Sequence, residues 1–285
     1  MFKNQFKTLI LLVALSALIL LFGQLIGGKN GLVFAFVIAL LMNFGTYFFS
    51  DKLVLKIYGA KPLDQERYGY IYEMVEGLCQ NANLPMPKLW LIETEMANAF
   101  ATGRNPAHAS VAVTSGILNI LDKHELRGVI AHELSHVKNR DILIATVAAT
   151  IATTIAYMAD IFRWSFIFGS SDRDDNKGGA WGALLATIFM PIAAMLIQLA
   201  ISRSREYLAD ETGAKISHDP FALASALEKL SMNAQVRHVQ PENNAQTSTA
   251  SLFIVYPFSG GAIINLFSTH PPMEKRIERL RNMVL

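Results

Sequence analysis

Charged residues are scarce in this sequence. Asp, Glu, Lys and Arg make up 17% of its 285 residues, whereas a soluble domain carries about 25%. Hydrophobic residues make up 52%, which is more apolar surface than a wholly soluble monomer can readily bury. The single cysteine cannot form an internal disulfide, so a disulfide scaffold is excluded. The net charge of +2 gives no reason to expect a nucleic-acid partner.

The apolar residues are concentrated in four stretches without charge, each close to the 20 or so residues that a membrane-spanning helix needs. A cleaved signal peptide is the alternative for the first stretch, because Lys3 and Lys7 precede it. The stretch is long for that role and no small-residue cleavage site is evident before Lys29. A buried core helix is the alternative for the third. We therefore predict a multi-pass membrane protein with spans at residues 8–28, 30–50, 142–159 and 178–202.

The Lys and Arg residues that flank these stretches predict the orientation. With the N-terminus inside, most of them fall in inner segments, as the positive-inside rule requires. The two longer polar regions and the C-terminus then face the cytoplasm. The predicted organisation is two transmembrane helices in residues 1–50, a cytoplasmic α+β part in 51–141, a transmembrane hairpin in 142–202 and a cytoplasmic helical part in 203–285.

The polar regions carry the patterns of a small α+β lobe. Apolar residues recur at helical spacing in several segments, and short apolar runs bounded by turn residues indicate strands. A polar, turn-rich segment at residues 240–251 predicts a loop. The expected helices are residues 63–82, 122–139, 220–233 and 271–283, and the expected strands are 88–93, 98–103 and 110–114.

One helix of this lobe contains the motif His-Glu-x-x-His. His132 and His136 are four residues apart, so both imidazoles lie on one helical face. Two imidazoles on one face can bind one Zn²⁺. Glu133 lies beside them, where it can take the proton from a zinc-bound water. The motif therefore predicts a hydrolytic zinc centre.

A catalytic zinc takes three protein ligands, and Glu206 is the candidate for the third. His136 precedes the third apolar stretch and Glu206 follows the fourth. If the two stretches form an antiparallel hairpin, both side chains emerge on the same side of the membrane. Asp210 lies one helical turn after Glu206, where it can accept the free N–H of a ligating histidine and fix its orientation.

Peptide hydrolysis also needs a group that stabilises the oxyanion. The candidates are His270, a predicted catalytic residue, and Tyr207, with Arg203 behind them. The alternative for His270 is a structural role at the start of the last helix. Asp141 is expected to pair with Arg205 or its neighbour Arg140, or to cap a turn, and is given no chemistry.

The strand at residues 98–103 is a candidate substrate-binding edge. An extended substrate can add to the free edge of a sheet through backbone hydrogen bonds, with little sequence selectivity. The alternative is an ordinary core strand. The residues of this predicted edge are Asn98, Ala99, Phe100, Ala101, Thr102 and Gly103.

Four motifs together resemble the HtpX family of membrane-embedded zinc metalloproteases, distant relatives of the CAAX prenyl proteases. They are NAFATG at 98–103, HELSH at 132–136 with Asp141 following, SRSREYLAD at 202–210 and THPP at 269–272. The resemblance implies one Zn²⁺ held by His132, His136 and Glu206, with Glu133 as general base.

The resemblance also has implications for fold and biology. It implies an α-helical multi-pass membrane protein with a small cytoplasmic α+β, zincin-like (gluzincin) metalloprotease lobe. It implies a location in the cell inner membrane, a lipid bilayer and polypeptide substrates as partners, and stress-linked quality control of misfolded membrane proteins. Functional overlap with other membrane quality-control proteases is expected.

Other function classes fit the sequence less well. A di-iron carboxylate enzyme uses two Glu-x-x-His pairs, and Glu133 and His136 form the only one here. A structural zinc site usually includes cysteine, and Cys79 is distant in the chain. A transporter is poorly supported, because the only support for it is four predicted spans and one acidic residue at the edge of a span. The remaining alternative is a metal-binding membrane scaffold or chaperone without proteolytic activity.

Overall fold

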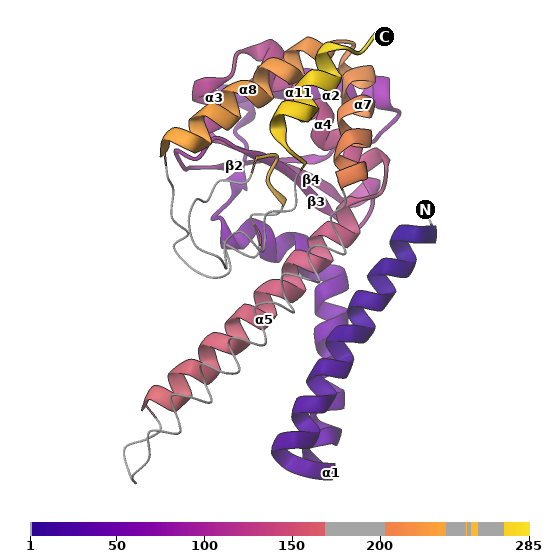
Figure 1. Ribbon diagram of the computed structural model, residues 1–285, viewed down its shortest axis with the longest axis vertical. Coiled ribbons are helices and arrows are strands. Elements are labelled where there is room, and N and C mark those ends of the chain that lie inside the picture. The colour runs from indigo at the N-terminus through magenta and orange to yellow at the C-terminus, as the bar shows by residue number, and fades with distance from the viewer. Residues whose placement is uncertain (1, 169–202, 238–248, 250–251, 256–270) are drawn as a thin grey trace.

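A lobe of short helices and strands is joined to two long helices that project from one side of it (Figure 1). The computed structural model describes residues 2–168, 203–237, 249, 252–255 and 271–285. The two projecting helices are α1 (Phe2–Ile57) and α5 (Ile142–Phe168). The predicted fourth span, the turn at 170–179 and nearly all of the predicted loop at 240–251 lie outside the described residues.

Helix α1 consists of two arms that reverse direction at Gly28, whose backbone is non-helical with φ of 54°. Gly23 and Gly31 lie on either side of the reversal and contact each other, because neither has a side chain to keep the arms apart. Asn43 also donates a 2.7 Å hydrogen bond from Nδ2 to Oγ of Ser16 across the arms. The first two apolar stretches are therefore separated by a reversal of the chain, and the second arm extends past residue 50 to Ile57.

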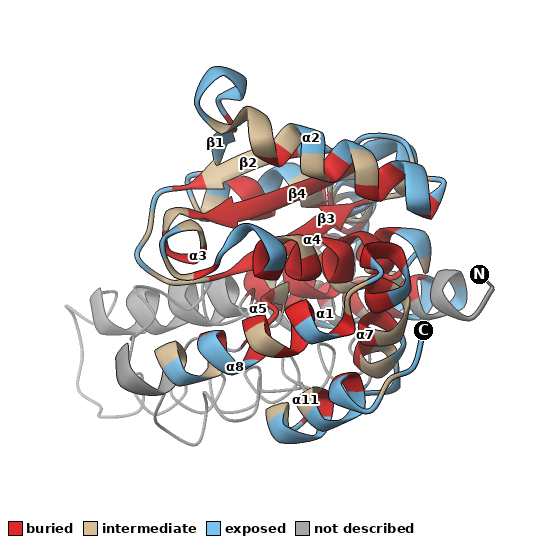
Figure 2. Cartoon of the chain, turned by 90° about the horizontal axis from the view of Figure 1, so that it is seen from above, coloured by how far each residue is buried: buried red, intermediate tan, exposed pale blue. Residues whose placement is uncertain are grey.

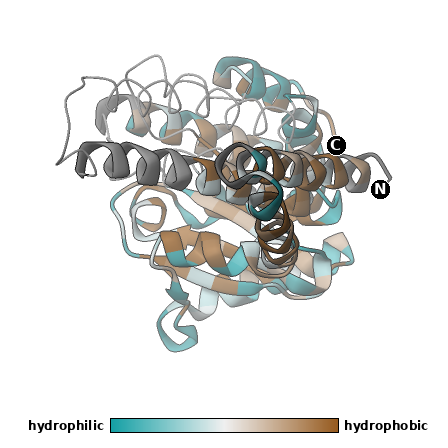
Figure 3. Ribbon diagram, turned by 90° about the horizontal axis from the view of Figure 1, so that it is seen from below, coloured by the Kyte–Doolittle hydropathy of each residue, from teal (hydrophilic) through white to brown (hydrophobic). Residues whose placement is uncertain are grey.

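The arms of α1 pack against α5 through small and branched side chains. Their outer surfaces stay apolar: Phe34 is 69% exposed and Leu41 is 67% exposed. Seen from below, these arms are coloured mostly as hydrophobic (Figure 3). Among the described residues, one helical segment, Gly28–Ile57, is both long and apolar enough to cross a membrane. Lipid is the natural solvent for such a surface.

The lobe contains a four-stranded sheet with the order β1-β2-β4-β3. Strands β2 and β4 are parallel, and the outer strands pair antiparallel to them. β3 is thus one of the two edge strands of the described sheet, and its Ala101 pairs with Val111 of β4. The strands are β1 (Lys61–Pro62), β2 (Lys88–Ile92), β3 (Ala99–Gly103) and β4 (Ala109–Thr114).

The helices of the lobe confirm the predicted pattern. The side chain of Asp64 caps the N-terminus of α2 by accepting hydrogen bonds from the backbone N–H groups of Glu66 and Arg67. The sequence did not predict the short strand β1, the turn η1 (Pro106–His108) or helix α3 (Ser115–Ile120). The other helices are α2 (Gln65–Ala82), α4 (Lys123–Lys138), α7 (Arg203–Ser217), α8 (Pro220–Arg237) and α11 (Met273–Arg281).

Helix α4 lies at the centre of the lobe and is almost entirely buried (Figure 2). It packs against α2, α7, α8 and β3. A capping box starts it: Asp122 accepts from the N–H of Glu125, whose side chain accepts from the N–H of Asp122. The buried Glu125 also forms a 2.7 Å ion pair with Lys229 of α8. These contacts fix the helix that carries the His-Glu-x-x-His motif.

The close crossing of α4 and α7 depends on Gly213. A Cβ atom added there would lie 2.9 Å from both the N and the Cα of His132. Gly213→Ala is therefore expected to push the helices apart and to lower the free energy of unfolding by about 1–3 kcal/mol, as overpacking does. Thermal unfolding in detergent measures this. Gly77→Ala on α2 is the control, because the new methyl group would meet nothing within 4 Å. Alanine forms helices better than glycine does, so this variant should be as stable as wild type or more stable. Equal melting temperatures for both variants would contradict the prediction.

Candidate metal centre

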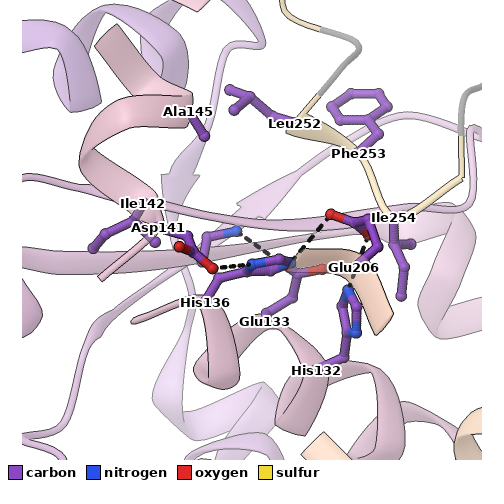
Figure 4. Close-up of a pocket in the computed structure, with 11 residues that line it drawn as sticks. His132, Glu133, His136, Asp141, Ile142, Ala145, Glu206, Leu252, Phe253 and Ile254 are labelled. Atoms are coloured by element: carbon purple, nitrogen blue, oxygen red, sulfur yellow. Dashed lines mark hydrogen bonds and ion pairs between the residues drawn. The ribbon is translucent and has the colours of Figure 1, made fainter. Parts of the chain in front are cut away.

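His132, Glu133 and His136 lie on the buried middle of α4. The two imidazole rings are perpendicular, with centroids 4.9 Å apart, as i and i+4 positions on one helical face require. The Nε2 atoms of both rings point toward the carboxylate of Glu206 on α7 (Figure 4). The structure thus brings together the three side chains that the sequence predicted as ligands.

The spacing of these side chains fits one tetrahedral cation. His132 Nε2 lies 3.7 Å from Glu206 Oε2, and His136 Nε2 lies 3.7 Å from Glu206 Oε1. One ligand atom from each residue can be chosen so that all lie within 4.8 Å of one another. Donors bound at about 2.0–2.1 Å to a tetrahedral zinc are roughly 3.3 Å apart. Small side-chain shifts would close this difference, and two imidazoles with one carboxylate form a catalytic zinc donor set.

The far side of His132 faces Asp210, the residue expected from the sequence to accept the free N–H of a ligating histidine. Nδ1 of His132 lies 3.0 Å from Oδ1 of Asp210, although the approach angle does not make this a hydrogen bond. Asp210 in turn is held by Arg276 of α11, whose Nε and terminal nitrogen donate at 2.8 Å and 2.7 Å to its two oxygens. Burial opposes the charge on Asp210, but Arg276 outweighs it and lowers the pKa of Asp210 to about 2. An ionised carboxylate therefore faces His132.

Arg276 is a functional residue that the sequence analysis missed. Its side chain is 0% exposed, and it also lies 3.7 Å from Oε2 of Glu206. It occupies the buried face of α11 together with Leu280, four residues later. The signal in the sequence was an arginine on the otherwise apolar face of a short basic helix.

His136 has an equivalent partner in Asp141, which the sequence analysis gave no chemistry. Oδ2 of Asp141 lies 3.5 Å from Nδ1 of His136. The end of α4 explains this contact. Arg140 adopts the left-handed conformation with φ of 58°. The N–H of Arg140 then bonds to the carbonyl of Val137, and the N–H of Asp141 to that of His136, which is a Schellman motif. This reversal of the chain at the end of α4 brings the side chain of Asp141 back to the ring of His136.

Glu133 lies beside the two histidines and contacts the edge strand. Its Oε2 accepts a 2.9 Å hydrogen bond from the N–H of Ala101 in β3. Burial raises the pKa of Glu133 to about 8; nearby His136 opposes the rise and Glu206 adds to it. A carboxylate of raised basicity next to a metal site suits proton transfer near neutral pH.

A small cavity of about 40 Å³ opens onto these side chains, enough for one or a few water molecules. One wall is Leu252, Phe253 and Ile254 (Figure 4). Asn98, just before β3, holds this wall. Its Oδ1 accepts from the N–H of Ile254 and its Nδ2 donates to the carbonyl of Val255, both at 3.1 Å. Asn98 therefore shapes the cavity as well as preceding the edge strand.

Comparison with known proteins decides the family. The model of Peptidase family M48 matches residues 65–284. The chain belongs to peptidase family M48. A Protease HtpX homolog of Syntrophobacter fumaroxidans is 54% identical over 283 residues, covering 98% of this chain and 99% of that relative. A Protease HtpX homolog of Thermococcus sibiricus is 52% identical over 280 residues, covering 97% and 95%.

A solved structure supports the M48 fold. The crystal structure of S. mikatae Ste24p matches with a TM-score of 0.50 at 18% identity; the match covers 98% of this chain but only 65% of the Ste24p chain. At this identity the likeness concerns the fold. The M48 member described here is thus a membrane metalloendopeptidase with a mostly helical, Ste24-like fold.

In this M48 member, two of the predicted oxyanion-stabilising residues, Tyr207 and Arg203, do not line the cavity at the metal site. The guanidinium of Arg279 lies over the ring of Tyr207, 4.4 Å from the ring centroid. Arg203 is exposed. His270 lies outside the described residues, so its role stays a prediction.

The shifted pKa values of the site predict how its stability depends on pH. Burial opposes the charge on His136, but Asp141, Glu206 and Glu133 outweigh it and raise its pKa to about 9; the pKa of Glu133 is raised as well. Above about pH 6.5 the folded site therefore holds protons that the unfolded chain has released, and stability falls as pH rises to about 9. Below about pH 6.5 the lowered pKa of the buried His132 acts in the opposite direction.

This dependence is expected in chelator-treated protein, with a slope of at most about 1.4 kcal/mol per pH unit for each proton held. Zinc-loaded protein should show a weaker dependence, because the metal displaces those protons. Melting temperatures from pH 6 to 9 check both forms. A chelated form that grows more stable over this range would disprove the assignment.

Proposed function

We propose that this M48 peptidase is a zinc-dependent endopeptidase whose metal is held by His132, His136 and Glu206. The observation that carries the proposal is the convergence of two Nε2 atoms on one carboxylate at 3.7 Å. A bound Zn²⁺ would supply a Lewis acid that polarises the substrate carbonyl and lowers the pKa of water to about 7.

Glu133 is proposed as the general base. It lies on the face of α4 that borders the cavity, within reach of a water held there, and can pass the proton to the leaving amine. Asp210 and Asp141 orient the two imidazoles through their Nδ1 atoms, so the Nε2 atoms are directed toward the metal position. Nε2 of His132 also lies 3.4 Å from a terminal nitrogen of Arg276, a contact that a bound metal would replace. Arg276 keeps Asp210 ionised and in position. His270 remains the proposed oxyanion-stabilising residue.

The substrate is proposed to pair with β3. The N–H of Ala101 points away from β4 toward Glu133, so this outer edge faces the metal-binding side chains. A carbonyl oxygen of a substrate strand at this edge could accept the hydrogen bond from the N–H of Ala101 when the carboxylate of Glu133 turns toward water. Backbone pairing of this kind suits an enzyme that cleaves many misfolded sequences. The proposed edge comprises Asn98 through Gly103.

The biological setting is also proposed. We place the enzyme in the cell inner membrane, with four spans, both termini and the active site in the cytoplasm, and misfolded membrane proteins as substrates. The domain limits at residues 50, 141 and 202 are part of this proposal. A tag inserted at residues 170–179 should be labelled from the outer face; labelling from the cytoplasm would overturn the topology.

The test of the function is metal analysis combined with cleavage of casein by the purified protein in detergent. About one zinc per chain is expected, with loss of cleavage after chelation and recovery on adding zinc. A non-proteolytic scaffold would bind zinc without cleaving casein or a membrane-protein substrate.

Glu206→Ala tests the third ligand separately. Losing one of three ligands should weaken zinc binding more than about 100-fold, beyond the 10–100-fold typical of residues that only orient a ligand. Competition with a chromogenic chelator measures this affinity. Glu211→Ala is the control, because Glu211 is a partly exposed acid on the same helix, paired with Lys215. Unchanged zinc affinity in Glu206→Ala would assign the third ligand elsewhere.

A further inference from the structure

A second cavity lies where α1 joins the lobe, and it shares no lining residue with the metal site. Its volume is about 410 Å³, which is within the range of small-molecule sites. It forms between the end of α1, the start of β2 and the turn between β3 and β4. Half of its lining residues are aromatic phenylalanines or cationic Lys and Arg residues: Phe44, Phe48, Phe49, Lys52, Lys88 and Arg104.

The aromatic side lies at the level of the membrane surface. The segment Gly28–Ile57 has 30 residues, or about 45 Å at 1.5 Å per residue, whereas the hydrocarbon core is about 30 Å thick. Counted from Gly28, the core ends near Phe48, and the following residues lie among headgroups. Phe48 is 39% exposed and Phe49 is 49% exposed. Exposed phenylalanine rings suit the boundary between headgroups and acyl chains, where they can pack against the acyl chains.

The cationic side has charges that are not neutralised by the protein. Nζ of Lys52 lies 5.3 Å from the ring centroid of Phe49, and the guanidinium of Arg104 lies 5.4 Å from that of Phe48. Within the described part of the chain, neither these two cations nor Lys88 forms an ion pair with a carboxylate. Against the three cations, the lining includes a single acid, Asp51. The cavity therefore favours an anion.

We propose that this cavity binds the headgroup phosphate of an anionic phospholipid. Basic pockets beside membrane helices take anionic headgroups, and Lys or Arg binds phosphate by charge and hydrogen bonds. A free phosphate would use only the cations, whereas a lipid would also place its glycerol and acyl chains against the exposed phenylalanines. The lipid would join α1 to the turn that follows β3, the strand that contacts Glu133. The site is independent of the hydrolytic chemistry.

The test uses the full chain, delipidated in detergent, with phosphatidylglycerol binding followed by native mass spectrometry. Wild type should bind phosphatidylglycerol in preference to phosphatidylcholine with the same acyl chains. Lys52→Gln/Arg104→Gln should weaken this binding at least about tenfold. The matched control is Arg67→Gln/Lys123→Gln, which also removes two cations that lie over aromatic rings, at 5.1 Å and 5.0 Å. The control should bind as wild type does.

Two further variants separate lost charge from lost folding. Lys52→Arg/Arg104→Lys keeps both charges and should keep the affinity. Lys88→Gln, at the exposed first residue of β2, should weaken binding about threefold on its own. Equal binding of the two lipids by wild type, or undiminished binding by the Lys52→Gln/Arg104→Gln variant, would overturn the proposal. Displacement of the lipid by an equal concentration of inorganic phosphate would also overturn it, in favour of a free-anion site.

Discussion

Replacing Glu133 by Gln is expected to lower the rate of peptide cleavage by about 10²–10⁴-fold, the usual contribution of a general base. The amide keeps the size of the carboxylate, and its oxygen can still accept the hydrogen bond that Ala101 donates to Oε2 at 2.9 Å. The fold and the metal ligands should therefore be unaffected. Single-turnover cleavage and zinc content, measured on the same preparation, check both parts.

Glu73→Gln provides the matched control, because Glu73 is an exposed carboxylate on α2 that does not line the cavity at the metal site. It should cleave at the wild-type rate. If Glu133→Gln cleaved within about threefold of that control while retaining zinc, Glu133 would not be the base. If it lost zinc as well, the activity loss would not report on proton transfer, and the rate would have to be compared at saturating zinc.

Arg276→Met is expected to destabilise the protein by about 3–5 kcal/mol, the cost of breaking a buried ion pair from one side. The substitution leaves Asp210 buried without its guanidinium partner. Arg276 is the largest reason that the pKa of Asp210 lies near 2, so that pKa should rise. Zinc affinity should also fall about 10–100-fold, because Asp210 would no longer hold His132 in position. Thermal unfolding and chelator competition measure the two effects.

Lys275→Met is the control for this prediction, since Lys275 is exposed on the same helix. It should change neither quantity appreciably. Replacing both partners, in Asp210→Leu/Arg276→Met, should recover part of the stability, because well-packed apolar side chains often substitute for a buried ion pair. It should not recover zinc affinity. A melting temperature for Arg276→Met equal to that of Lys275→Met would refute the structural role assigned to the pair.

The side chains that converge at the candidate metal centre were predictable because simple spacing determines them. His132 and His136 had to share a helical face, and the hairpin predicted between them and Glu206 would return the chain to the same side of the membrane. Asp210, one turn after Glu206, followed from the same periodicity. The predicted helices and the three longer strands were found for similar reasons, since their apolar patterns match the periods of 3.6 and 2 that buried faces impose.

Arg276 and Asp141 were not predictable from local patterns. Arg276 reaches Asp210 from a separate helix, so no spacing rule links them. Asp141 depends on a Schellman motif, for which glycine is the usual signal, and here Arg140 occupies the left-handed position. The short strand β1 pairs through only two residues, too few to create a pattern. Each of these features arises from tertiary packing rather than from the sequence nearby.

The position of Arg276 also bears on the order in which the site can form. Helix α11 follows α4 and α7 in the chain, so the ribosome releases it after His132, His136 and Glu206 have all been made. A nascent chain can therefore present every metal ligand before the guanidinium that secures Asp210 has emerged from the exit tunnel. Folding of α11 onto α4 and α7 and the ordering of His132 are therefore expected to be coupled, because the guanidinium from the later helix fixes the carboxylate that faces this imidazole.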